Sequence, residues 1–300
     1  MVRRLSPVRY AWVTRAALTS LCVIVVSGAA VRLSGSGLGC ADWPKCNDER
    51  FIDVSSVHGA IEQVNRLFTG VVTVLVMAAV LAARLLPERR RDLERLAWLL
   101  VVGVIGQIVL GGVVVLTDLN PVANQGHFVL SMFLVGTGLV LVRKAGGSAP
   151  RLELPVRERR IVRIIGLAAG CAILTGTAVT GAGPHAGDED APRLDVGIET
   201  VARVHGIAVM VALAAIVSLV VSTRRRGLGT LGPRVETLLA VGVLQATVGY
   251  VQYFNEIPAL LVAVHVALAT AFFLVVVDLW YAVAPAGDQA PAANRATVSR

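Results

Sequence analysis

A short polar stretch, residues 57–69, holds the side chains best suited to chemistry. His58, Glu62 and Asn65 are spaced four and then three residues apart, so a helix places all three on one face. An apolar run follows them, and a carboxylate at the mouth of such a helix is costly unless it has a partner or a task. Glu62 could serve as a proton acceptor. The alternatives are an ion pair with Arg66, one turn away, or a favourable place at the positive end of the helix dipole.

Three further histidines, His127, His205 and His265, fall inside long apolar segments. Two imidazoles that face each other across a helix bundle suit the iron of a haem, whose two axial positions lie on opposite sides of the porphyrin. We therefore consider His205 and His265 as a ligand pair. The alternative is that each histidine hydrogen-bonds a neighbouring helix or lines a polar cavity. Zinc is disfavoured because this half of the chain lacks a third ligand at metal-binding spacing.

The segments that must position these residues are strongly apolar. Of the 300 residues, 55% are hydrophobic and 16% are charged, and the mean hydropathy is +0.72, which is typical of a polytopic membrane protein. Eight segments approach the roughly 20 residues with which a helix crosses the hydrocarbon core. They are residues 11–32, 57–86, 96–117, 124–142, 161–182, 198–222, 235–254 and 258–283. The sequence therefore predicts an all-α membrane protein with eight transmembrane helices.

Charged residues alternate between the loops. Basic residues precede the first segment and follow the second, fourth and sixth, whereas the other loops hold mostly acidic residues. Positively charged loops stay in the cytoplasm, so we expect both termini on the cytoplasmic side of the cell membrane. The net charge of +8 comes from these short basic loops beside membrane helices, which argues against nucleic acid as a partner.

The two halves of the chain resemble each other. Residues 28–31 match residues 176–179, and Gln107 precedes His127 by the same 20 residues that separate Gln245 from His265. Because four segments separate the copies, the repeat is parallel. We expect two pseudo-symmetric four-helix bundles with a linker and a disordered tail on the cytoplasmic side. These regions are the amino-terminal bundle in 1–143, the linker in 144–160, the carboxy-terminal bundle in 161–283 and the tail in 284–300.

The loop after the first segment carries a specific motif. Residues 31–40 read Val-Arg-Leu-Ser-Gly-Ser-Gly-Leu-Gly-Cys, and residues 42–46 read Asp-Trp-Pro-Lys-Cys. This loop resembles the first outer loop of the haem A synthase family, and the stretch Glu62-x-x-Asn65-Arg66 is similar to the E-x-x-H-R motif of that family. The resemblance covers about residues 10–283, because the four-plus-four layout and the helical histidines also fit.

This resemblance implies an oxidoreductase that converts a methyl group of haem O to a formyl group, giving haem A for terminal oxidase assembly. The carboxy-terminal bundle would hold the iron of a haem b cofactor between His205 and His265. The amino-terminal bundle would bind the substrate haem through His127, with Glu62 as the catalytic carboxylate. Arg66 and Arg203 could hold haem propionates, because guanidinium pairs well with carboxylate; the alternatives are that each extends to the membrane surface or pairs with a glutamate.

One residue of the motif departs from the family pattern. Asn65 stands where the family has a histidine, and asparagine is a poor ligand for iron. Either His58, two turns nearer the surface, takes over, or the substrate iron has one protein ligand or a water. Counted from the basic ends of their helices, Asn65 rather than His58 is the depth equivalent of His205.

The remaining candidates lie in or near the outer loops. Cys40 and Cys46, with five residues between them, fall in an oxidising compartment, where we expect a disulfide or a redox-active pair rather than two free thiols. His185 occupies a loop where some family members carry a second cysteine pair, and it either approaches a haem edge or is a plain loop residue. Glu199, the repeat mate of Glu62, is a relic, a structural group or a functional one.

Partners and alternatives follow from the same resemblance. The expected partners are the substrate haem O and the lipid bilayer. The sequence leaves open whether the chain also associates with the protohaem farnesyltransferase that makes haem O, or with a second copy of itself in a homo-oligomer. The main alternative is a non-catalytic dihaem b-type cytochrome that carries electrons, and a third is a transporter. The repeated histidines argue against a transporter, and Glu62 with the cysteine loop argues against a plain electron carrier.

Overall fold

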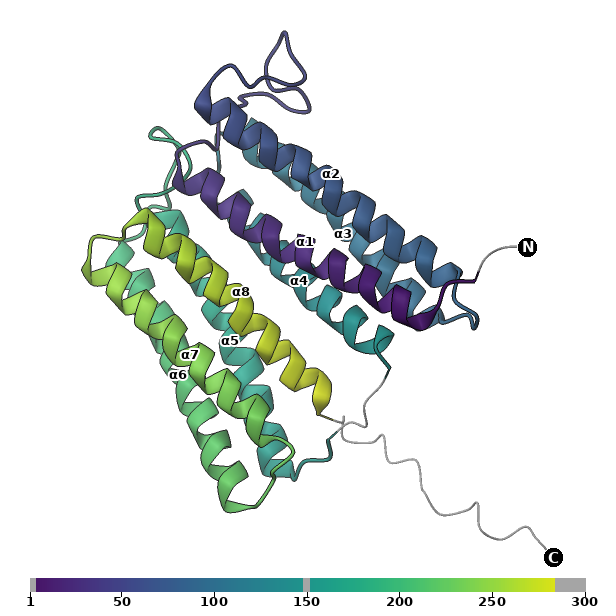
Figure 1. Cartoon of the computed structure of the whole chain (residues 1–300). Helices are drawn as coiled ribbons and strands as arrows, with labels where there is room; N and C mark the ends of the chain where they lie inside the picture. The colour runs from purple at the N-terminus through teal and green to yellow at the C-terminus, as the bar shows by residue number, and fades with distance from the viewer. Residues whose placement is uncertain (1–3, 148–151, 284–300) are drawn as a thin grey trace, which may run out of the picture.

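A computed structural model describes residues 4–147 and 152–283, so the predicted tail and part of the predicted linker lie outside the described residues. The described chain forms eight α-helices that run side by side (Figure 1). They are α1 (Pro7–Leu33), α2 (Val57–Arg84), α3 (Arg91–Leu116), α4 (Pro121–Ala145), α5 (Val156–Ala182), α6 (Ile198–Arg225), α7 (Gly232–Phe254) and α8 (Ala259–Ala282). Each is long and apolar enough to cross a membrane, which confirms the predicted multi-pass membrane protein with eight helices.

Local sequence signals explain where several helices begin. The Ser56 hydroxyl caps α2 by accepting the Gly59 N–H at 2.9 Å, and the Asn120 side chain caps α4 by accepting the Val122 N–H at 3.0 Å. Pro121 follows Asn120 at the first helical position, where proline costs no hydrogen bond. Two helices begin five residues before the apolar segments predicted for them, α3 at residue 91 and α5 at residue 156. Charged residues extend these helices, and most of them are at least partly exposed, whereas Glu158 is buried and pairs with Arg226 of α6 at 3.2 Å.

The helices form two groups. Helices α1–α4 form the amino-terminal group, in which each helix contacts the next and α4 closes back on α1, so that α2 and α4 are diagonal. Helices α5–α8 form the carboxy-terminal group in the same way, with α8 closing on α5 and α6 diagonal to α8. The groups meet where α1 and α4 contact α8 and where α4 contacts α5 (Figure 1).

We call the end at which α1, α3, α5 and α7 finish the cysteine-loop end, after the long α1–α2 loop that lies there (Figure 1). The main apolar core of the carboxy-terminal group lies toward the opposite end. Its fully buried members include Ile165, Ile216, Leu219, Leu238 and Leu279. His58, His127, His205 and His265 all lie in the half of their helices nearer the cysteine-loop end. The apolar core of the carboxy-terminal group does not extend to the level of His205 and His265.

Candidate functional site

The disulfide loop is fastened to the start of α2 by Glu62 and Arg66. Cys40 and Cys46 are bonded to each other, and both are buried. The buried Glu62 carboxylate accepts the Cys40 N–H at 2.7 Å and pairs with the Arg66 guanidinium at 2.6 Å. Arg66 also donates to the carbonyl oxygens of Asp42, Lys45 and Cys40 at 3.0–3.1 Å. The ion pair therefore holds a loop that has little regular structure of its own.

A second brace stabilises the far side of this loop. The Asp53 carboxylate accepts the Asn47 side-chain N–H at 2.8 Å and the Ser55 N–H at 3.0 Å. Hydrogen bonds from Ser55 are the main reason that the pKa of the Asp53 carboxyl is lowered. The loop thus presents a fixed surface beside Glu62.

The three polar residues on the first turns of α2 have different partners. Glu62 turns to the loop, as described above. The exposed His58 lies with its Nδ1 at 2.9 Å from the Ser36 hydroxyl, also in the α1–α2 loop. Asn65 accepts a hydrogen bond from the Ser27 hydroxyl of α1 through its Oδ1 at 2.7 Å. The shared helix face therefore does not form a single cluster of side chains.

His205 and His265 come together across the carboxy-terminal group. Their ring centres are 6.4 Å apart, with an angle of 73° between the ring planes. The Nδ1 of His205 lies 3.0 Å from the Ala172 carbonyl oxygen, which orients the ring and leaves Nε2 free to bind another group. The Nε2 of His265 lies 3.1 Å from the Gln245 amide nitrogen, and its buried Nδ1 has no partner among the described residues.

His127 stands at the corresponding place in α4. Its buried Nδ1 has no partner in the described part of the chain. The side chain of Gln107 donates to the His127 carbonyl oxygen at 3.0 Å and to the Ser131 hydroxyl at 2.6 Å. The spacing of Gln107 and Gln245 from the histidines was visible in the sequence as a repeat, but their contacts with these histidines were not predicted.

Around these positions every helix has a run of residues none of which is buried. In the amino-terminal group the runs are 26–30, 64–71, 105–111 and 122–131. In the carboxy-terminal group they are 170–176, 198–211, 243–254 and 263–269. A bundle whose interior is filled by its own side chains buries one stripe of each helix at every level. At the level of the histidines, therefore, neither group has the stripe of buried residues that its apolar core has nearer the opposite end.

The paired imidazoles fit the two ligand positions that a porphyrin-bound metal leaves for protein side chains. Among residues 4–147 and 152–283 there is no group of three or more His, Cys, Asp or Glu side chains that could hold a metal ion. Two imidazoles supply two ligands, and a porphyrin supplies the remaining four. A separation of 6.4 Å between ring centres leaves room for one metal ion between the rings, because metal–imidazole bonds are about 2.0–2.1 Å long.

The other predicted site residues lie away from these rings. Arg203 and Glu199 form an exposed pair at 3.7 Å on the first turn of α6, and the Arg66 guanidinium is already occupied by the disulfide loop. His185 lies between the two groups: its carbonyl oxygen accepts a hydrogen bond from Arg32 of α1, and its Nε2 is 2.8 Å from the Ile257 carbonyl oxygen. His185 therefore links loops at the cysteine-loop end.

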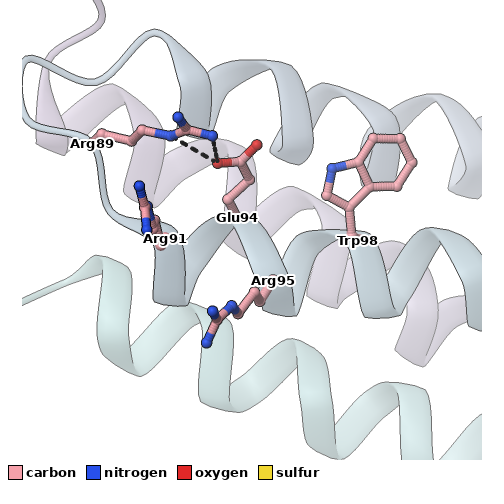
Figure 2. Close-up of a pocket in the computed structure, with 5 residues that line it drawn as sticks. All are labelled: Arg89, Arg91, Glu94, Arg95 and Trp98. Atoms are coloured by element: carbon pink, nitrogen blue, oxygen red, sulfur yellow. Dashed lines mark hydrogen bonds and ion pairs between the residues drawn. The ribbon is translucent and has the colours of Figure 1, made fainter.

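A hollow on the surface lies at the opposite end of the molecule. It is lined by Arg89, Arg91, Glu94, Arg95 and Trp98, and Arg89 pairs with Glu94 at 3.3 Å (Figure 2). The neighbouring Arg90 is bonded to Asp92, which raises the pKa of its guanidinium. Because this hollow lies toward the opposite end of the helices from the histidines, it belongs to the basic α2–α3 turn and not to the candidate site.

Two groups of apolar helices with histidines at matching levels define a multi-pass membrane protein with intramembrane imidazoles. Residues 10–55, which include most of α1 and the disulfide loop, match the model of a family described as cytochrome oxidase assembly protein. The chain is 32% identical over 141 residues to the haem A synthase of Bacillus pumilus strain SAFR-032, a match that covers 45% of this chain and 46% of that protein.

Other relatives give the same result. The haem A synthase of Listeria monocytogenes strain HCC23 is 32% identical over 129 residues, covering 41% of this chain and 42% of that protein. The haem A synthase of Exiguobacterium sibiricum is 26% identical over 147 residues, covering 48% and 50%. The matches span half or less of the length of these curated relatives. They confirm the resemblance to the haem A synthase family that the first outer loop predicted.

Proposed function

We propose that the protein is a haem A synthase, which oxidises a methyl group of haem O to a formyl group and so supplies haem A for terminal oxidase assembly. The observation that carries this proposal is the pair His205 and His265, whose ring centres lie 6.4 Å apart across the carboxy-terminal group. The family match over the disulfide loop and the names of the relatives support the same reaction.

The carboxy-terminal group is the proposed place of a resident haem b. His205 and His265 would hold its iron, and the haem would supply electron transfer when bound. The Ala172 carbonyl fixes the ring orientation of His205, and the Gln245 amide lies against His265. Such outer contacts orient the ligands and tune the metal that they hold.

The amino-terminal group is the proposed place of the substrate, haem O. His127 would bind its iron, because this ring has a buried nitrogen without a partner among the described residues. Glu62 would accept protons that are released when the methyl group is oxidised and water adds to it, while the electrons pass to an external electron acceptor. Donors from Cys40 and Arg66 fix both of its oxygens in place, and a carboxylate has further lone pairs with which to accept a proton. The disulfide loop would cover this side of the substrate.

The larger architecture belongs to the same proposal. We infer two pseudo-symmetric bundles, 1–143 and 161–283, with both termini in the cytoplasm. The two groups repeat the same order of helix contacts, and the contact of α1 with α8 has its counterpart in that of α5 with α4. The arginines around the hollow of Figure 2 support a cytoplasmic position for the α2–α3 turn, because positively charged loops stay in the cytoplasm. The farnesyltransferase that makes haem O would then be a neighbour in the same membrane.

The non-catalytic dihaem cytochrome shares the histidine pair and differs only in its product. The test is to express the chain in a host that makes haem O and to extract the pigments. We expect haem A or its hydroxylated intermediate, together with haem b bound to the protein. Glu62→Gln should abolish the conversion while haem b stays bound, and Glu199→Gln, at the matched position of α6, should leave it intact. Bound haems with no modified haem would favour the cytochrome, and a colourless protein would refute both.

A further inference from the structure

Each of the three intramembrane histidines lies against a glycine of the helix that precedes it. A Cβ atom built on Gly176 would lie 3.1 Å from the Cε1 of His205, and one on Gly249 would lie 2.9 Å from the Cε1 of His265. At Gly111 the corresponding distance to His127 is 3.4 Å. Each of these glycines therefore leaves the space that an imidazole ring occupies where two neighbouring helices pack together, α5 with α6, α7 with α8 and α3 with α4. We call such a glycine a seat for the ring, and the contact between the two helices a seam.

The fourth seam, between α1 and α2, has the seat but no imidazole. Gly28 is the sequence counterpart of Gly176, and a Cβ built on it would meet nothing within 4 Å. Asn65 stands at the depth of His205, and its shorter side chain is drawn to Ser27, the residue before the glycine. The oxygen of the Asn65 amide is occupied by that bond, and its N–H₂ group has no partner among the described residues.

We propose that the substrate iron in the amino-terminal group is bound by His127 alone, and that its opposite face is an open site for a water-sized or diatomic ligand. This inference rests on the proposed function, since it concerns how haem O is held. The Ser27, Gly28 and Asn65 corner supplies the space and the Asn65 amide supplies a hydrogen-bond donor. Steric access and donors on this side of a haem decide whether it binds small molecules or only transfers electrons.

His58 is not placed to close this site. It lies seven residues before Asn65, which is about 10 Å along the helix axis at about 1.5 Å per residue. It is exposed, and its ring is bonded to Ser36 of the disulfide loop. The two groups therefore differ in the number of histidines that they offer to a haem iron. The carboxy-terminal group offers two, His205 and His265, and the amino-terminal group offers only His127.

Carbon monoxide tests the proposal, because it binds ferrous haem only where an axial position is open. The protein is purified with haem O and haem b bound, reduced without air, and exposed to the gas while its absorption spectrum is recorded. We expect one of the two haems to shift. Asn65→His should abolish the shift by seating an imidazole on Gly28. The mirror variant His205→Asn should make the second haem responsive as well.

The outcomes separate this inference from the proposed function. If both haems are bound and neither responds to carbon monoxide, the open site is refuted while the haem assignment stands. If His58→Ala then gains a response, His58 is the missing ligand and the proposal is equally overturned. A response that His58→Ala leaves unchanged, and that disappears together with bound haem O in His127→Ala, supports the proposal even if Asn65→His fails to fold. Protein without bound haem would instead refute the proposed function.

Discussion

Gly249→Ala is the sharpest probe of the histidine pair, because it adds one methyl group where the structure has no room. The new Cβ would lie 2.9 Å from the Cε1 and 3.4 Å from the Nδ1 of His265. Non-bonded carbons prefer a separation of at least about 3.5 Å, so the ring must retreat by about 0.6 Å. Ligand distances at a metal site tolerate only about 0.2 Å. The substitution should therefore weaken axial ligation by His265.

The expected magnitude can be set against the effect on the fold. Disturbing the contacts that orient a metal ligand commonly lowers affinity about 10- to 100-fold, which we expect here for haem b. Within a helix, alanine is more favourable than glycine by about 1 kcal/mol, so the helical fold itself should not become less stable. If Gly249→Ala loses haem b but keeps its fold, Gly249 makes room for the ring of His265. If the variant loses its fold, Gly249 is needed for the packing of the helices.

The assay is the amount of haem b per protein, measured as the pyridine complex, alongside the unfolding temperature in detergent. Gly111→Ala is the matched control, because its Cβ would lie at an ordinary 3.4 Å from His127 and should leave haem b unchanged. Full haem b content in Gly249→Ala would show that the ring adapts, and the reasoning from the glycine seat would be wrong. Equal loss in both variants would also contradict it.

Three further predictions test other contacts. Arg66→Lys should speed tryptic cleavage in the disulfide loop about tenfold. A lysine ammonium cannot hydrogen-bond three carbonyl oxygens and the Glu62 carboxylate together, and each hydrogen bond to a charged group contributes about 1.5–3 kcal/mol. An unchanged cleavage rate would show that Arg66 does not hold the loop in place. Gln245→Leu should keep haem b bound but move its reduction potential, which a redox titration would measure. Asp278→Asn should lower stability by only about 1 kcal/mol, seen as a small fall in unfolding temperature, because its partners Arg143 and Arg234 are partly exposed.

The sequence by itself determined the elements and their class. Hydropathy located eight helices because crossing a bilayer requires a long apolar run, and this requirement is local to each segment. The disulfide-loop motif pointed to the family for a similar reason, since its residues are adjacent in the chain. The ion pair of Glu62 with Arg66, one turn apart, was likewise among the alternatives predicted from helical spacing.

Only the tertiary structure decided which side chains meet. Glycines within membrane helices commonly mark places of close helix approach, but at Gly176 and Gly249 the structure puts histidine rings against the glycine. Asn65 and His58 looked like members of one helix face, yet Asn65 reaches α1 and His58 reaches the loop. Such contacts depend on how neighbouring helices are rotated and how far they are shifted along their axes. Periodicity within one helix carries no information about either quantity.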